Sequence, residues 1–162
     1  MTMTQCVGSS TTSATSSTSK VVSIASARPR TLISENASVW NEEVSNRLQD
    51  LIRLNYGWDG YNARPVGFVN ATFALQMLNN ICGPATPAPQ IVPGVNGDLQ
   101  LEWHTLQGDI ELHVEGPNNV HAWRALVGDL DGEELNLTVD FAAIAQWVRD
   151  ITEPPIAAAT AA

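Results

Sequence analysis

Positive charge is scarce in this sequence, and the shortage limits what the chain can bind. Its 162 residues include 8 Lys and Arg against 17 Asp and Glu, which gives a net charge of −9, and Lys20 is the one lysine. Phosphate backbones are bound by clustered cations, and anionic lipid surfaces repel acidic chains. We therefore expect neither direct nucleic-acid binding nor binding to a membrane surface.

Cysteines and long apolar runs are also few. Cys6 and Cys82 are the two cysteines, and their spacing predicts neither a disulfide framework nor a zinc site. No run approaches the ~18 apolar residues of a membrane helix, and residues 1–20 lack the apolar core of a secretory signal. These absences predict a cytoplasmic protein with reduced thiols.

Motifs of the common catalytic and nucleotide-binding sites are missing as well. The sequence contains no G-x-S-x-G, no H-E-x-x-H, no Walker loop and no G-x-G-x-x-G. Cys82 ends an expected helix, where the dipole disfavours a thiolate. We therefore expect no cofactor, and a binding protein is a better interpretation than an enzyme.

Composition divides the chain into three parts. Residues 1–27 hold 14 Ser or Thr and almost no large apolar side chain, so burial cannot offset the entropy of ordering them. We expect a disordered Ser/Thr-rich tail over 1–30, a single domain over 31–153, and a flexible Ala/Pro tail over 154–162.

Apolar periodicity within the domain predicts an α+β fold. Repeats of three and four residues indicate helices, and strict alternation indicates half-buried strands. Helices are expected over 37–54, 66–82 and 141–151, and strands over 99–104, 109–115, 120–127 and 135–139. A proline-rich connector should span 84–94. The prediction is an N-terminal αα-hairpin, an antiparallel meander of three to four strands, and a C-terminal helix packed on one sheet face.

Charge pairing predicts the register of the first hairpin. Placing Trp103 opposite Ile110 would set Glu102 against Glu111, and like charges directly opposite are destabilising. Placing Trp103 opposite Leu112 avoids this contact and closes a two-residue turn at Gln107-Gly108. The second register is the one expected.

The stretch N-Y-G-W-D-G-Y-N-A-R-P, residues 55–65, joins the first two helices and is unusually aromatic. Asp59 in such a turn is expected to accept backbone N–H bonds, and the Trp58 ring can be partly buried while its N–H donates. A structural corner is the favoured interpretation. A docking surface through Trp58, Asp59 and Tyr61 is the alternative, and a catalytic Asp59 is the third.

Two further groups are candidate sites. If the expected register holds, His104, His113 and Glu111 share an exposed sheet face with Glu102, and imidazole and carboxylate are zinc-type ligands. A solvated strand face explains the same pattern. Residues 98–162 carry 12 acids and 2 bases, and the turn with Asp131, Glu133 and Glu134 should attract basic partners.

Two segments resemble a set of small uncharacterised bacterial proteins. These share a W-D-G-x-x-A-x-P corner, a P-x-x-x-G-x-(L/I)-x-L-E-W strand and a closing amphipathic helix with a Trp. The matching residues are Trp58, Asp59, Gly60, Ala63, Pro65, Pro93, Gly97, Leu99, Leu101, Glu102, Trp103 and Trp147. The resemblance covers about residues 55–151 and implies a fold but no activity.

Charge and composition together favour a small acidic interaction protein that binds a basic protein, of the antitoxin, immunity or inhibitor type. Two alternatives stay open. One is a metal-assisted enzyme that uses the His/Glu strand face, and the other is a homo-oligomeric structural protein that associates through an unpaired edge of the sheet.

Overall fold

Three helices and five strands make up the residues that the computed structural model describes, 38–129 and 131–152. The expected tails at 1–30 and 154–162 lie outside these ranges. The elements are α1 (Val39–Ile52), α2 (Phe68–Ile81), β1 (Gln90–Pro93), β2 (Leu99–His104), β3 (Gly108–Gly116), β4 (Asn119–Leu126), β5 (Glu133–Leu137) and α3 (Ala142–Thr152). This is the predicted α+β order with one additional strand.

Helix α1 follows the predicted pattern. Trp40, Val44, Leu48 and Leu51 are all buried, so one apolar stripe faces the core. The Trp40 indole also donates to the carbonyl of Gly83 over 3.1 Å, which ties the start of α1 to the end of α2.

Helix α2 differs from its prediction in its start and in its buried face. It begins at Phe68 with Gly67 as N-cap, so Pro65 precedes the helix instead of occupying its first turn. Val69 is 60% exposed, although the four-residue spacing of Val69, Phe73, Met77 and Ile81 predicts one buried apolar stripe. The buried positions of α2 are Ala71, Ala74, Leu75, Met77, Leu78 and Ile81. Two of these positions are alanines, which a search for the periodicity of large apolar residues does not reveal.

The sheet is a five-stranded antiparallel meander in the order β1-β2-β3-β4-β5. Strand β1 was missed by the sequence analysis, because it lies inside the segment expected to be a connector. Pro93 pairs with Leu99 at the end of this strand. Proline is tolerated on an edge strand, where no ladder N–H is needed on the outer side.

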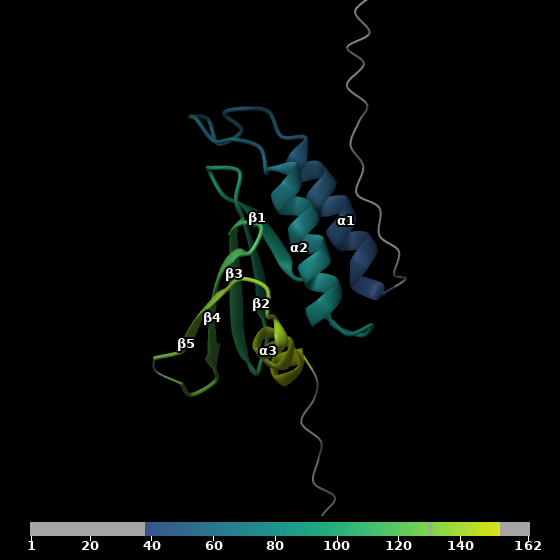
Figure 1. Cartoon of the computed structure of the whole chain (residues 1–162), viewed down its shortest axis with the longest axis vertical. Coiled ribbons are helices and arrows are strands. Elements are labelled where there is room, and N and C mark those ends of the chain that lie inside the picture. The colour runs from purple at the N-terminus through teal and green to yellow at the C-terminus, as the bar shows by residue number, and fades with distance from the viewer. Residues whose placement is uncertain (1–37, 130, 153–162) are drawn as a thin grey trace, which may run out of the picture.

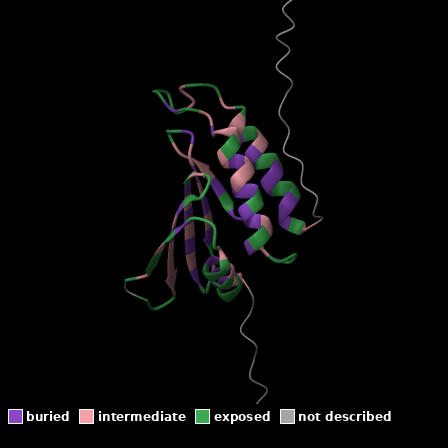
Figure 2. Ribbon diagram, viewed as in Figure 1, coloured by how far each residue is buried: buried purple, intermediate pink, exposed green. Residues whose placement is uncertain are grey.

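All three helices lie on the same face of the sheet (Figure 1). Inward-facing strand residues meet the helices in one core, and buried positions alternate with less buried ones along the strands (Figure 2). The inward set is Ile91, Leu99, Leu101, Trp103, Ile110, Leu112, Val114, Val120, Ala122 and Leu137. In β4 it is therefore Val120 and Ala122 that face inward, and His121 and Trp123 face outward. We call the side away from the helices the open face.

The predicted register of the β2–β3 hairpin is wrong. Trp103 lies opposite Ile110, and Glu102 lies opposite Glu111. Neighbouring polar groups reduce the repulsion that argued against this register, because Gln100 donates to Glu111 over 2.9 Å and Glu102 lies 3.3 Å from a ring nitrogen of His104.

The turn of this hairpin also favours the observed register. Three residues, 105–107, separate the strands, and the Thr105 hydroxyl donates to the Gly108 carbonyl over 2.9 Å. The same hydroxyl accepts the N–H of Gln107 over 3.1 Å. The side chain of one threonine thus organises the whole turn, which is an ST-type turn.

The side chain of Asp140 lies at the start of α3, where aspartate is a common helix cap. The Asp140 carboxylate accepts the N–H of Ala142 over 2.9 Å, which satisfies one of the unpaired donors of the first turn. Ile144, Trp147, Val148 and Ile151 are the buried residues of this helix.

Candidate functional site

The aromatic corner between α1 and α2 is organised by Asp59. Its Oδ1 accepts the backbone N–H groups of Tyr61 over 2.9 Å and Ala63 over 3.1 Å. Gly57 and Gly60 have φ of +76° and +87°, a conformation that glycine adopts without steric cost. The hydrogen bond from the Tyr61 N–H is the largest influence on the pKa of Asp59 and, together with the N–H of Ala63, lowers this pKa against the opposing effect of desolvation. Asp59 therefore serves the turn itself.

Trp58 serves the same corner, and Tyr61 does not. The Trp58 indole N–H donates to the Arg64 carbonyl over 2.9 Å. Tyr61 is 83% exposed and Tyr56 is 68% exposed, so their rings are the parts of the corner that a partner could contact. Of the three residues expected as a docking surface here, Asp59 and Tyr61 are exposed and Trp58 is half-buried, and the Asp59 carboxylate is already bonded within the turn.

The corner is joined to the β1–β2 turn, although the two segments are far apart in sequence. Arg64 N–H donates to the Val95 carbonyl over 2.9 Å, and Gly67 N–H donates to the Gly97 carbonyl over 2.9 Å. The Asn70 side chain also donates to Gly97 O over 2.9 Å. The W-D-G corner and the P-x-x-x-G turn thus form one unit at this end of the molecule.

Asp98 links this unit to His113 on the open face of the sheet. One carboxylate oxygen accepts the N–H of Asn96 over 3.0 Å, and the other lies 2.5 Å from Nε2 of His113. Partial burial would raise the pKa of Asp98, but the hydrogen bonds from His113 and from the turn outweigh it and hold this pKa below its usual value. The Nε2 atom of His113 is therefore occupied by its hydrogen bond with Asp98.

The expected metal ligands share the open face but have separate partners. His104 lies 3.0 Å from Asp109 and 3.3 Å from Glu102, and the hydrogen bond to Asp109, followed by that to Glu102, raises the pKa of His104. Glu111 is bound by Gln100 instead. Within residues 38–129 and 131–152, no group of three or more His, Cys, Asp or Glu side chains is arranged to hold a metal ion.

The acidic candidates lie at the opposite end of the sheet from the corner. Glu133 and Glu134 open β5, opposite Arg124 and Trp123, whereas the corner contacts the turn before Leu99. Figure 1 shows this β4–β5 end far from the α1–α2 loop. The sequence-predicted binding residues therefore form two groups, and the structure does not bring them together.

Arg124 partly neutralises the acidic end and anchors α3. Its guanidinium lies 3.0 Å from Glu133 and 3.1 Å from Asp150, with its centre 4.7 Å from the Trp147 ring centroid. Glu134 keeps 69% of its side-chain surface exposed and lies 3.7 Å from His121. Glu134 and Asp131 are thus the carboxylates most available to a partner.

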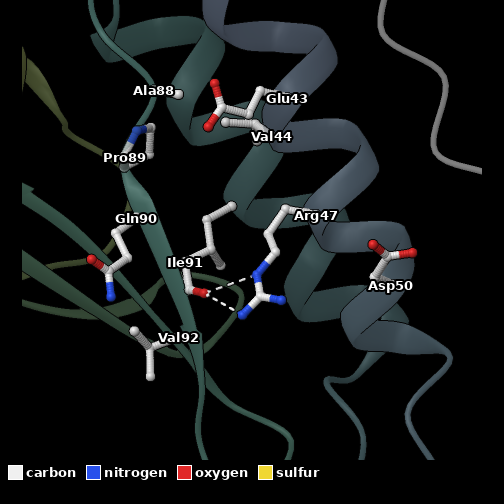
Figure 3. Close-up of a pocket in the computed structure, with 9 residues that line it drawn as sticks. All are labelled: Glu43, Val44, Arg47, Asp50, Ala88, Pro89, Gln90, Ile91 and Val92. Atoms are coloured by element: carbon white, nitrogen blue, oxygen red, sulfur yellow. Dashed lines mark hydrogen bonds between the residues drawn. The ribbon is translucent and has the colours of Figure 1, made fainter.

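A groove of about 760 Å³ between α1 and β1 was not predicted from the sequence (Figure 3). Arg47 reaches across it, and its Nε and Nη2 donate to the Ile91 carbonyl over 3.2 and 3.1 Å. Glu43 and Asp50 flank Arg47 on α1. The sequence carried no signal for this contact, since β1 itself was not recognised.

Cys82 has no catalytic environment. Burial raises the pKa of its thiol to about 12, so almost no thiolate exists at neutral pH. This agrees with its position directly after α2.

No protein-family model, curated protein or solved structure matches this chain. In the described ranges, no helix combines the length and the apolar character needed to cross a membrane.

Proposed function

We propose that this protein is a small acidic interaction module that binds a basic protein partner. The observation that carries the proposal is the acidic stretch around β5. Residues 129–140 contain five carboxylates and no Lys or Arg. Apart from the contact between Arg124 and Glu133, no ion pair to an Arg is found for these carboxylates within the described residues. Such a field attracts cations and accelerates association with a basic surface.

The distribution of the arginines strengthens this field. Arg47 is bound to the Ile91 carbonyl, and Arg124 lies on the helix side of the sheet under α3. Of the five described strands, β4 alone contains an arginine, and the open face carries Glu102, Asp109, Glu111 and Glu134 without one. A basic partner therefore meets little opposing charge when it approaches the open face or β5.

The partner class that fits best is a protein with a functional basic surface. An acidic module of this size can cover such a surface and block it, as an antitoxin, an immunity protein or an inhibitor does. A cytoplasmic location suits this role. The exposed Tyr61 ring at the other end supplies a second, apolar contact if the partner is large enough to reach it.

A pull-down with the full tagged chain as bait tests the proposal. Bound proteins are identified by mass spectrometry after washing at low and at high salt. The proposal predicts one dominant basic protein that is lost at high salt, because screened charges no longer attract. A bait that retains no basic protein at low salt would contradict it.

A further inference from the structure

The two edges of the sheet differ in their ability to accept another strand. At the β1 edge, the Ile91 carbonyl already accepts two hydrogen bonds from Arg47, and α1 lies alongside (Figure 3). Pro89 and Pro93 flank Ile91 and have no N–H to donate. An incoming strand would find few backbone partners, and this is how natural edges are blocked.

The β5 edge has none of these protections among the described residues. The sheet order ends at β5, and no described strand pairs with its outer side. Glu133, Glu134 and Asn136 are exposed. Alternate residues of an edge strand present N–H and C=O groups outward, so β5 offers a ready backbone ladder.

We infer that β5 receives an extended, basic segment of the partner as a sixth strand of the sheet. The inference rests on the proposed function and names its mode of recognition. Strand addition supplies affinity through backbone hydrogen bonds, and side chains on alternating sides supply specificity. Glu133 and Glu134 are consecutive, so they point to opposite faces of the sheet. Lys or Arg residues on the open-face side of the added strand therefore meet Glu134, whereas Glu133 on the other side already pairs with Arg124.

A second copy of this chain fits the same edge poorly. Antiparallel pairing of two β5 strands centred on Leu135 would place Glu134 opposite Asn136 of the other copy. The glutamates of both copies would then share a ladder of five residues. Each Glu134 would then lie diagonally across from the Glu134 of the other copy, close enough for the two carboxylates to repel. A basic strand replaces this repulsion with attraction.

Two peptides of equal charge test the inference on the full chain. One alternates Arg with Val and can donate backbone N–H groups, whereas the other alternates Arg with Pro and cannot form a strand ladder. Binding is measured by calorimetry, and backbone protection is measured by hydrogen exchange. We expect the Arg-Val peptide to bind, and the amides of β5 to gain protection that the Arg-Pro peptide does not give.

Charge variants locate the interaction. Asp131→Arg with Glu134→Arg should weaken Arg-Val binding about tenfold, because facing like charges repel. Glu133 is left unchanged because it pairs with Arg124. The matched control, Glu42→Arg with Glu43→Arg, makes the same charge change on α1 and should leave binding nearly unchanged.

Three results would overturn strand addition at β5. Equal binding of both peptides without β5 protection would show purely electrostatic binding, and the proposed function would survive. If the Arg-Val peptide does not bind while the chain still captures a basic protein, strand addition is also excluded, and the proposed function survives. Concentration-dependent protection of β5 in the free chain would identify a second copy as the occupant.

Discussion

Asp59 makes two backbone hydrogen bonds from one carboxylate atom, and its role can be separated into shape and charge. Asp59→Asn keeps an acceptor oxygen and removes the charge, whereas Asp59→Ala removes both. Since the corner positions the α1–α2 connection, we expect the Ala variant to unfold at the lowest denaturant concentration and the Asn variant at an intermediate one. Glu42→Gln, an exposed change on α1, is the control and should match the wild type.

The pH dependence of this effect has a defined sign. The pKa of Asp59 is lower in the folded protein than its ordinary value of 3.8, so its stabilising contribution is fully present above 3.8. It is lost as the pH falls through the lower, folded-state value. The difference between wild type and Asp59→Asn should therefore narrow in denaturant titrations as the pH falls below 3.8. A difference that grew with acidification would refute the assigned role.

Cys82 gives a second test at the scale of one residue. With its pKa raised to about 12 by burial, the thiol should react with a thiol reagent at least about 100-fold more slowly in the folded chain than in denaturant, because the thiolate is the reactive form. The measurement uses a Cys6→Ser background, so that Cys82 is the one thiol present. Fast labelling under native conditions would show that the end of α2 is not packed as described.

Some side-chain contacts could be predicted from the sequence, and others could not. Asp59 acts within a few residues of its own position, so turn chemistry predicted its contacts. The bond between His113 and Asp98 spans 15 positions, and the contact of Arg47 with Ile91 spans 44. Contacts at such separations depend on the tertiary arrangement, and a local pattern does not contain them.

At the scale of elements, the helices and three of the strands were predictable because their apolar residues repeat with a clear period. The predicted range of β5 began two residues too late, because Glu133 and Glu134 at the start of the strand look like part of a turn. Strand β1 was not predicted, because the prolines of this segment, including Pro93, indicated a connector and not an edge strand. The predicted β2–β3 register was wrong because the charge rule counted only directly facing residues and left out the lateral contacts of Gln100 with Glu111 and of His104 with Glu102.

The contact between α1 and the β1 edge can be tested directly. Arg47→Ala removes two hydrogen bonds from a partly exposed guanidinium, and we expect it to lower the free energy of unfolding by about 1 kcal/mol. Hydrogen exchange at β1 should also become faster. Arg53→Ala is the matched control, because Arg53 bonds to Gln49 on its own helix, and it should change stability by less than about 0.5 kcal/mol.

Equal effects of the two substitutions would contradict the view that Arg47 closes the β1 edge. The β1 edge could then no longer be called blocked, and the inference that a strand adds at β5 and not at β1 would lose this support. An Arg47→Lys variant adds a graded test, because a lysine ammonium cannot make the paired contact of the planar guanidinium.

For the whole molecule, the sequence shows where the acidic residues lie along the chain but not where they lie in the fold. The acidic C-terminal half was evident from composition, and the turn with Asp131, Glu133 and Glu134 was selected from it. The fold adds that these residues lie in β5 or just before it, that no described strand pairs with the outer side of β5, and that β5 is far from the aromatic corner. Docking at the corner and docking at β5 are therefore separable by mutation.

The most direct measurement is the pull-down repeated with three baits side by side at low and high salt. These are the wild type, the Asp131→Arg/Glu134→Arg variant and the Glu42→Arg/Glu43→Arg variant. The account predicts that the wild type and the α1 variant capture the same basic protein at low salt and that the β5 variant does not. Equal capture by all three baits, or capture that persists at high salt, would contradict recognition of a basic partner through the acidic edge.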